Sequence, residues 1–149
     1  INFTFIGIFD HNNISSITEE KIQEWVNENL INFIEHKNDI RKFIRDSDCV
    51  ILPSYREGLP KFLLESAAIG RPIICSDVPG CREIVKDLYN GILCKPKDIE
   101  SLYTKIKLFI NMDEKTISKM IINSRKIVEK NFDYKKINDF YLEIINNKI

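Results

Sequence analysis

The chain has 149 residues, of which 44% are hydrophobic, and its 22 lysines and arginines balance its 22 aspartates and glutamates. This length and apolar content predict one domain with a substantial core. The zero net charge gives no indication of a nucleic-acid partner. No apolar run approaches the roughly 20 residues needed to cross a bilayer, and no signal peptide is recognisable.

Short apolar segments alternate with segments whose apolar residues recur at helical spacing. The segments expected to form strands are 3–9, 31–34, 48–52, 72–75 and 91–94. The segments expected to form helices are 18–29, 40–45, 60–69, 81–85 and the C-terminal region from residue 98. Thr18 can cap the first of these helices, and Asn38 or Asp39 the second. This repeated alternation predicts an α/β layer with a parallel sheet.

The segment from Pro53 to Glu65, PSYREGLPKFLLE, places two glutamates at a junction between a predicted strand and a predicted helix. Glu57 lies in the loop, and Glu65 lies in the helix, which has Pro60 in its first turn. Free N–H groups and positive dipole character at such a junction attract phosphate and other electron-rich oxygens. Glutamates there can accept hydrogen bonds from hydroxyls. The alternative for Glu65 is a surface ion pair with Lys61, one helical turn earlier.

The residues that follow mark where this helix ends and where the next strand begins. Gly70 predicts the end of the helix, because glycine readily adopts the left-handed conformation found there, and Pro72 cannot continue a helix. The loop 76–80 then follows the next predicted strand. In a parallel sheet this loop lies at the same edge as the Glu57 loop, where ligands of such sheets bind.

The segment from Glu57 to Val85, EGLPKFLLESAAIGRPIICSDVPGCREIV, resembles the donor-binding half of the family 4 retaining glycosyltransferases, which have the GT-B fold. In that family a serine-containing loop precedes E-G-x-P, and L-E, G-x-P and G-x-x-E follow. The residues that match are Ser54, Glu57, Gly58, Pro60, Leu64, Glu65, Ala67, Ala68, Gly70, Pro72, Gly80 and Glu83. The resemblance covers nearly the whole chain, and it is closest to enzymes that build bacterial surface polysaccharides.

The resemblance implies a Rossmann-like nucleotide-sugar-binding domain over residues 1–149. The full enzyme would move a sugar from a nucleotide, with UDP expected, to a saccharide or lipid-linked acceptor, with retention of anomeric configuration. Glu65 would accept hydrogen bonds from the ribose, and Glu57 would act on the sugar as the catalytic residue. Backbone N–H groups near Glu57 would hold the sugar and diphosphate, although Pro60 has none to donate. The residues implied to line the donor site with Glu65 are Ser54, Gly58, Leu59, Pro60, Lys61 and His36.

His36 falls in the loop where the family contacts the nucleotide base. The family usually has glycine one position earlier, where this chain has Glu35, and a solvent-facing loop histidine is the alternative. The two histidines lack metal-ligand spacing with each other or with the cysteines. With backbone amides and a helix dipole available, the resemblance implies that no metal and no other cofactor is required. The four cysteines, which have no CxxC spacing, are expected to be reduced and buried: Cys49, Cys75, Cys81 and Cys94.

The chain opens on Ile1, at what resembles the second strand of the domain, so we expect a fragment that is inactive alone. The resemblance implies that the domain's first strand and helix, with the Arg and Lys that hold the diphosphate, lie outside this sequence. It implies the same for the N-terminal GT-B domain, which supplies most of the acceptor site. A helix at about 134–147 would cross to that domain. The expected location is cytoplasmic, or peripheral at the inner face of the membrane for the full-length enzyme.

Two other functional classes are compatible with the same residues. A GT-B-like sugar-nucleotide epimerase would use the same nucleotide-binding half with acid and base residues elsewhere. A non-catalytic α/β interaction module would explain the strands but not the register of E-G-x-P and L-E. Nucleotide binding distinguishes the module from the other two, and transfer of a labelled sugar distinguishes the transferase from the epimerase.

Overall fold

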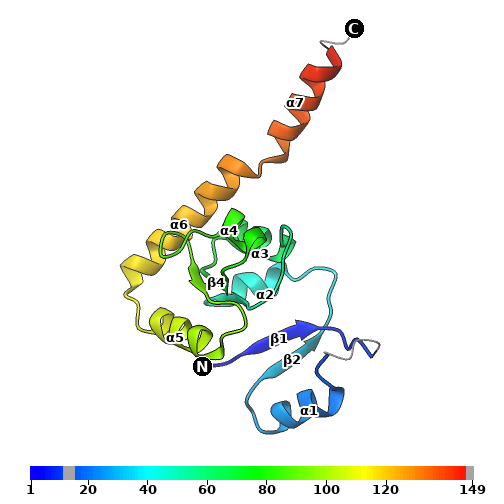
Figure 1. The fold of residues 1–149 in the computed structure, drawn as a ribbon, viewed down its shortest axis with the longest axis vertical. Coiled ribbons are helices and arrows are strands. Elements are labelled where there is room, and N and C mark those ends of the chain that lie inside the picture. The colour runs from blue at the N-terminus through cyan, green and yellow to red at the C-terminus, as the bar shows by residue number, and fades with distance from the viewer. Residues whose placement is uncertain (12–15, 147–149) are drawn as a thin grey trace. The chain divides into compact units, whose positions relative to one another are not determined.

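The structure is a computed structural model that describes residues 1–11 and 16–146, with only the backbone of Ile137. The chain forms two compact units, Ile1–Ile40 and Arg41–Ile149, which are described separately below. Figure 1 shows the elements in chain order. The expectation of one nucleotide-sugar-binding domain over residues 1–149 stays a prediction.

The first unit is a parallel pair of strands with one helix. Strand β1 (Thr4–Gly7) pairs with β2 (Asn32–Glu35), and α1 (Glu19–Asn27) connects them. The predicted cap is confirmed, because the Thr18 hydroxyl oxygen accepts a hydrogen bond from the backbone N–H of Lys21 at 3.3 Å. Helix α1 ends two residues earlier than expected. Asn29 there has a φ of 57°, in the left-handed region that ends helices.

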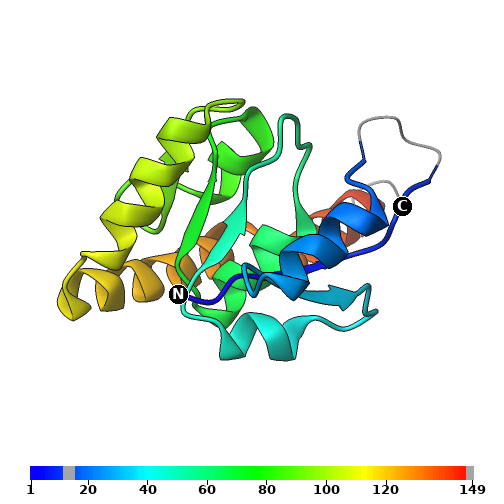
Figure 2. The ribbon, with the colours of Figure 1, turned by 90° about the horizontal axis from the view of Figure 1, so that it is seen from below.

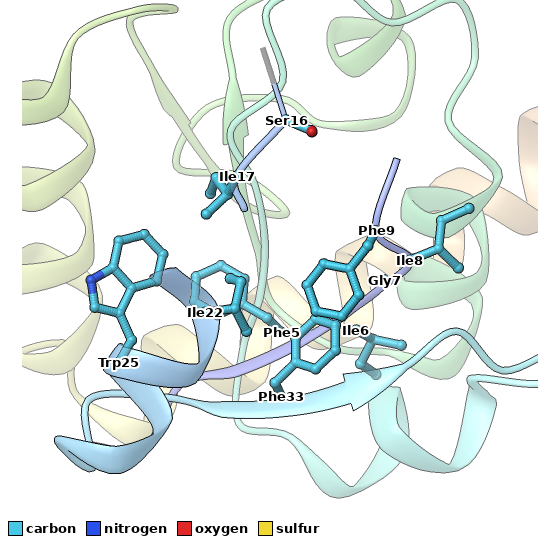
Figure 3. A pocket seen from close by; sticks show the side chains of 10 residues that line it. All are labelled: Phe5, Ile6, Gly7, Ile8, Phe9, Ser16, Ile17, Ile22, Trp25 and Phe33. Atoms are coloured by element: carbon cyan, nitrogen blue, oxygen red, sulfur yellow. The ribbon is translucent and has the colours of Figure 1, made fainter. Parts of the chain in front are cut away.

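An apolar pocket of about 220 Å³ lies between α1, the strands and the segments next to them. Figure 3 shows the ring of Phe9 facing that of Phe33, with their centroids 5.0 Å apart. Phe5 and Ile17 on the pocket wall are 49% and 51% exposed, so this face is only partly covered. The lining residues are Phe5, Ile6, Gly7, Ile8, Phe9, Ser16, Ile17, Ile22, Trp25 and Phe33. None of these lining residues is ionisable.

The second unit contains a three-stranded parallel sheet in the order β3-β4-β5. Its strands are β3 (Val50–Leu52), β4 (Ile73–Ser76) and β5 (Ile92–Cys94). Its helices are α2 (Arg41–Asp46), α3 (Lys61–Ile69), α4 (Pro79–Ile84), α5 (Ile99–Ile110), α6 (Glu114–Asn131) and α7 (Tyr134–Asn146). All four residues of the central strand β4 are buried. The predicted α/β alternation with parallel strands is confirmed, with boundaries that move by no more than two residues.

The core of this unit lies where α5 and α6 meet the sheet. Met120 of α6 packs with Ile74 and Ile92 of the two adjacent strands, and all three are about 1% exposed. The partly buried side chains around them are Cys49, Ile51, Leu102, Ile106, Phe109 and Met112. Figure 2 shows α5, in yellow-green, beside the sheet and α6, in yellow to orange, turning back across its end. Ile110 is 48% exposed because it is the last residue of α5.

The start of β5 is held by a buried side-chain network. Asn90 is fully buried, and its side-chain oxygen accepts a hydrogen bond from the N–H of Lys86 at 2.7 Å. The Ser124 hydroxyl of α6 donates to the Asn90 carbonyl at 2.8 Å. A Cβ on Gly91 would lie 2.6 Å from the carbonyl oxygen of Ile73, so only glycine fits there. Gly91 thus allows β5 to pack closely on β4, and Asn90 holds α6 against the turn before β5.

Helix α7 confirms the helix predicted at about 134–147 as far as Asn146, and residue 147 lies outside the described residues. Several of its large apolar side chains are more than half exposed: Tyr134, Phe140, Tyr141, Leu142 and Ile145. Their predicted packing against a further domain stays a prediction. Among the described residues, every helix is too short or too polar to span a membrane.

Candidate functional site

The Glu57 loop joins the carboxyl end of β3 to the start of α3. Pro60 is the N-cap residue of α3, one position before the first turn that the sequence indicated, and no side chain caps this end. The first amides of a helix have no partner within it. An uncapped start of a nine-residue helix therefore offers backbone donors and positive dipole character to an anion.

The start of α4, which follows the loop after β4, lies against the backbone of the Glu57 loop. A Cβ built on Gly80 would lie 2.0 Å from the carbonyl oxygen of Gly58 and 2.5 Å from that of Glu57. These distances leave room only for a glycine beneath the Glu57 peptide. Because the two loops follow neighbouring parallel strands, this contact confirms the prediction that both lie at one edge of the sheet.

The side chain of Glu57 is half-buried, and it acts electrostatically on Cys81, the residue after Gly80. Burial, and next to it the charge of Glu57, raise the pKa of the Cys81 thiol, which also hydrogen-bonds with Cys75. Both thiols are fully buried and free of disulfides, as expected. A sequence pattern could not identify this electrostatic effect of Glu57 on Cys81, because it depends on how α4 packs.

Glu65 lies on α3, with 28% of its side chain exposed, and its Oε1 atom is 3.5 Å from the Nζ atom of Lys61. The alternative ion pair is therefore present in the structure. Lys61 is 86% exposed, and such a pair contributes only about 0.3–0.5 kcal/mol. Its lysine can move aside at small cost, so the pair leaves the Glu65 carboxylate available to a hydroxyl donor.

The other implied site residues differ in their surroundings. Ser54 is half-buried, Pro60 is buried, and Leu59 is 49% exposed. No atom lies within 4 Å of a Cβ built on Gly58, so a ligand can approach the backbone there. His36 belongs to the first unit, where its side chain is exposed and its N–H donates to the carbonyl of Gly7 at 2.8 Å. The site described here therefore consists of residues of the second unit.

A third loop reaches the same edge of the sheet. Lys97, after β5, has its Nζ atom 5.3 Å from the ring centroid of Tyr55 in the Glu57 loop. Lys97 adopts a φ of 60°, which is unusual for a residue other than glycine. Arg82 of α4 pairs with Asp77 of the loop after β4 at 3.0 Å. The sequence alone did not predict this contact of Lys97 with Tyr55, because it follows from the strand order and not from any local pattern.

Among the described residues, no three His, Cys, Asp or Glu side chains are grouped so that they could hold a metal ion. The independence from metals and cofactors stays a prediction. The groups that the site does present are carboxylates, backbone amides and nearby cations. This combination can accept hydrogen bonds from hydroxyls and can stabilise negative charge on an anion.

Comparison with known proteins gives a consistent result. The family described as glycosyl transferases group 1 matches residues 1–127. The chain is 34% identical over 115 residues to N,N'-diacetylbacillosaminyl-diphospho-undecaprenol alpha-1,3-N-acetylgalactosaminyltransferase of Campylobacter jejuni, a match over 76% of this chain and 29% of that protein. It is 32% identical over 117 residues to UDP-Gal:alpha-D-GlcNAc-diphosphoundecaprenol alpha-1,3-galactosyltransferase of Escherichia coli, a match over 75% of this chain and 30% of that protein.

The fold comparison agrees with these matches. HepE from Anabaena, solved in complex with UDP, superimposes with a TM-score of 0.81 at 23% identity, over 97% of this chain and 40% of that chain. This likeness confirms the predicted fold, the Rossmann-like part of a GT-B glycosyltransferase. The chain spans less than a third of the two curated relatives named above. With its family match over most of its length, the chain belongs to the family of glycosyl transferases group 1.

Proposed function

We propose that these residues form the donor-binding part of a retaining glycosyltransferase. The enzyme would move a sugar from a nucleotide, most simply UDP, to a saccharide or lipid-linked acceptor in the synthesis of a surface polysaccharide. The proposal rests on family membership and on the geometry of the Glu57 loop. It extends to the whole protein, of which this chain represents the donor half.

The contact of Gly80 with the Glu57–Gly58 backbone carries the proposal. Transfer from a nucleotide sugar requires that the sugar ring and the departing diphosphate be held in a fixed geometry. Here the backbone of Glu57 and Gly58, just before the uncapped start of α3, lies against Gly80 of α4, where a Cβ would be 2.0 Å from the Gly58 oxygen.

Each residue has a role in this proposal. Glu65 accepts hydrogen bonds from the ribose hydroxyls. Glu57 binds the sugar hydroxyls and acts as the catalytic carboxylate, while the amides of Gly58, Leu59 and Lys61 face the sugar and diphosphate. Ser54 lies in the same loop, and the contact of His36 with the nucleotide base stays a prediction. Uncapped amides and a helix dipole supply the charge stabilisation that a metal would otherwise give.

The relatives support the choice of substrates. The name of the Escherichia coli relative gives UDP-Gal as donor, and HepE was solved with UDP and with UDP-glucose. The names of both curated relatives place their acceptor sugar on diphospho-undecaprenol. We therefore propose a UDP-sugar as donor and a polyprenyl-diphosphate-linked sugar as acceptor for the whole protein.

A titration of the ¹⁵N-labelled chain with UDP, followed by NMR, tests the donor site. We expect chemical-shift changes centred on residues 54–65. Glu65→Gln should weaken UDP binding about 10-fold, because an ionised acceptor gives hydrogen bonds of about 1.5–3 kcal/mol. Glu28→Gln is the matched control: Glu20 and Glu28 repeat the eight-residue spacing in the α1 region, and Glu28 is exposed. No shift in this loop at millimolar UDP would favour the non-catalytic module.

A second experiment addresses the reaction in the longest native chain that contains these residues. With a labelled UDP-sugar and an undecaprenyl-diphosphate-linked sugar, we expect the label to appear in the lipid fraction, and Glu57→Ala to depress kcat more than UDP affinity. Epimerised nucleotide sugar without labelled lipid would contradict transfer and support the epimerase. An equal loss of UDP affinity and turnover in Glu57→Ala would contradict the role given to that residue.

A further inference from the structure

The outward face of α6 carries a row of lysines that its packing does not use. At about 100° per residue, these side chains fall within a sector of about 80° of the helix. We call this row the lysine stripe; it consists of Lys115, Lys119, Lys126 and Lys130, with Ile122 in the middle. It extends over about 22 Å of the helix at 1.5 Å per residue. All five side chains are exposed, and Ile122 is 54% exposed.

The orientation of the lysine stripe follows from the contacts on the other side of α6. Met120 and Ser124, on the opposite face, are buried against the sheet and against Asn90. Arg125, on the flank, donates through Nη1 to the carbonyl oxygen of Ala68 at 2.6 Å, which ties α6 to the end of α3. The stripe therefore points away from the core of its unit.

The charges of the lysine stripe are not compensated within the described residues. Arg125 pairs with Glu129 at 2.7 Å, but no ammonium group of the stripe forms an ion pair in that part of the chain. Lys115 and Lys119, like Lys126 and Lys130, are four residues apart, a spacing at which like charges destabilise a helix. The stripe thus opposes helix stability, and an anionic partner would relieve this repulsion.

We propose that the lysine stripe is a docking surface for a membrane that contains anionic lipids. Four lysines on one helix face match the surface potential of such a leaflet, and clusters of four to eight basic residues are typical of lipid-binding segments. Ile122 distinguishes this partner from a soluble polyanion, because an apolar side chain among lysines can enter the region below the headgroups. An acceptor linked to a lipid, as proposed above, would be presented at this surface.

Co-sedimentation with vesicles tests the docking surface on the chain itself. We expect binding to phosphatidylcholine vesicles with about one third phosphatidylglycerol, no binding to phosphatidylcholine alone, and weakening by added salt. Substituting the four lysines of the stripe by glutamine should reduce binding more than about 100-fold, since each lysine near such a surface contributes about 5-fold. Ile122→Ser should reduce it about 5-fold.

A matched variant separates the stripe from net charge. Four exposed lysines elsewhere, replaced together by glutamine, give the same charge change: Lys37, Lys42, Lys95 and Lys107. Circular dichroism checks that both variants fold. Equal loss in the two variants, or no sedimentation of the unmodified chain with anionic vesicles, would overturn the proposal. The proposal would also be overturned if the chain bound heparin as tightly as anionic vesicles and Ile122→Ser did not change binding to the vesicles. None of these measurements involves a nucleotide, so their outcome is separate from that of the UDP titration.

Discussion

The two sheets of this chain are both parallel but are buried very differently. All four residues of β4 in the second unit are buried, whereas Thr4 and Phe5 of β1 in the first unit are exposed. Parallel sheets are normally covered on both faces. Helices α3, α5 and α6 pack on the strands of the second unit, whereas within the described residues of the first unit α1 is the helix that packs on the strands. The difference shows that the candidate site stands on the better supported of the two sheets.

The largest effect is expected from removing core volume in the second unit. Ile74→Ala should lower the free energy of unfolding by about 2–5 kcal/mol, because Ile74 is 1% exposed and packs between β5 and α6. Phe5 lies in β1 of the first unit and is 49% exposed, so Phe5→Ala should lower the free energy of unfolding by less than about 1.5 kcal/mol. Urea denaturation followed by circular dichroism measures both. Equal losses would mean that the two sheets are equally buried in solution.

Three glycines of the two units differ in how much space a new Cβ would find. Gly80→Ala should destabilise the chain by about 2–3 kcal/mol and displace the Glu57 loop, because its Cβ would meet backbone atoms that cannot rotate away. Gly58→Ala and Gly7→Ala have nothing within 4 Å of the new Cβ and should change stability by less than about 0.5 kcal/mol.

Thermal unfolding and the UDP titration would measure these three variants. We expect Gly80→Ala to lose UDP binding together with stability, and Gly7→Ala to lose neither. If Gly80→Ala melted like the unmodified chain, the tight contact between the two loops would not exist in solution, and the geometric support for the donor site would be removed.

The response to alkaline pH should also separate the two units, because all four cysteines lie in the second. Burial raises the pKa of Cys49 from 9.0 to about 12, and it raises that of Cys75 as well. The folded chain then holds protons that the unfolded chain releases, so this stability is complete below pH 9 and is lost as pH rises toward the folded pKa. Each such thiol contributes a slope of up to about 1.4 kcal/mol per pH unit.

Urea denaturation between pH 8 and 11 should therefore show a steeper loss of stability in the unmodified chain than in Cys49→Ala. Lysines and tyrosines titrate in both proteins and cancel in the difference. A difference that does not change with pH would show that the Cys49 thiol is equally solvated in the folded and unfolded states.

The smallest effect is expected at the surface of the site. Lys61→Met should change the free energy of unfolding by no more than about 0.5 kcal/mol, because Lys61 is 86% exposed and its ion pair with Glu65 is screened. Its UDP affinity should change less than that of Glu65→Gln, since only the backbone N–H of Lys61 is assigned to the ligand. A thermal shift of several degrees in both Lys61→Met and Glu65→Gln, with unchanged UDP affinity, would instead support the ion-pair interpretation.

The elements of this chain were largely predictable because their signals are local. Gly70 ends α3 in a left-handed conformation with a φ of 82°, and Thr18 and Asp98 cap α1 and α5 as expected. The boundaries that differ depend on single turns, such as the position of Pro60 as N-cap instead of the first helical residue. The identity of the site was predicted from motif register, since Glu57, Gly58 and Glu65 match a known family pattern residue by residue.

The sequence by itself determined the α/β alternation, the family and the two glutamates at the strand-to-helix junction, because periodicity, caps and motifs act over a few neighbouring residues. Only the tertiary structure decided that Gly80 supports the Glu57 peptide, that the charge of Glu57 acts on the Cys81 thiol and that Lys97 reaches Tyr55. These interactions join residues from segments that follow different strands. The order and spacing of strands in the sheet create them, and those properties result from long-range packing that no local pattern encodes.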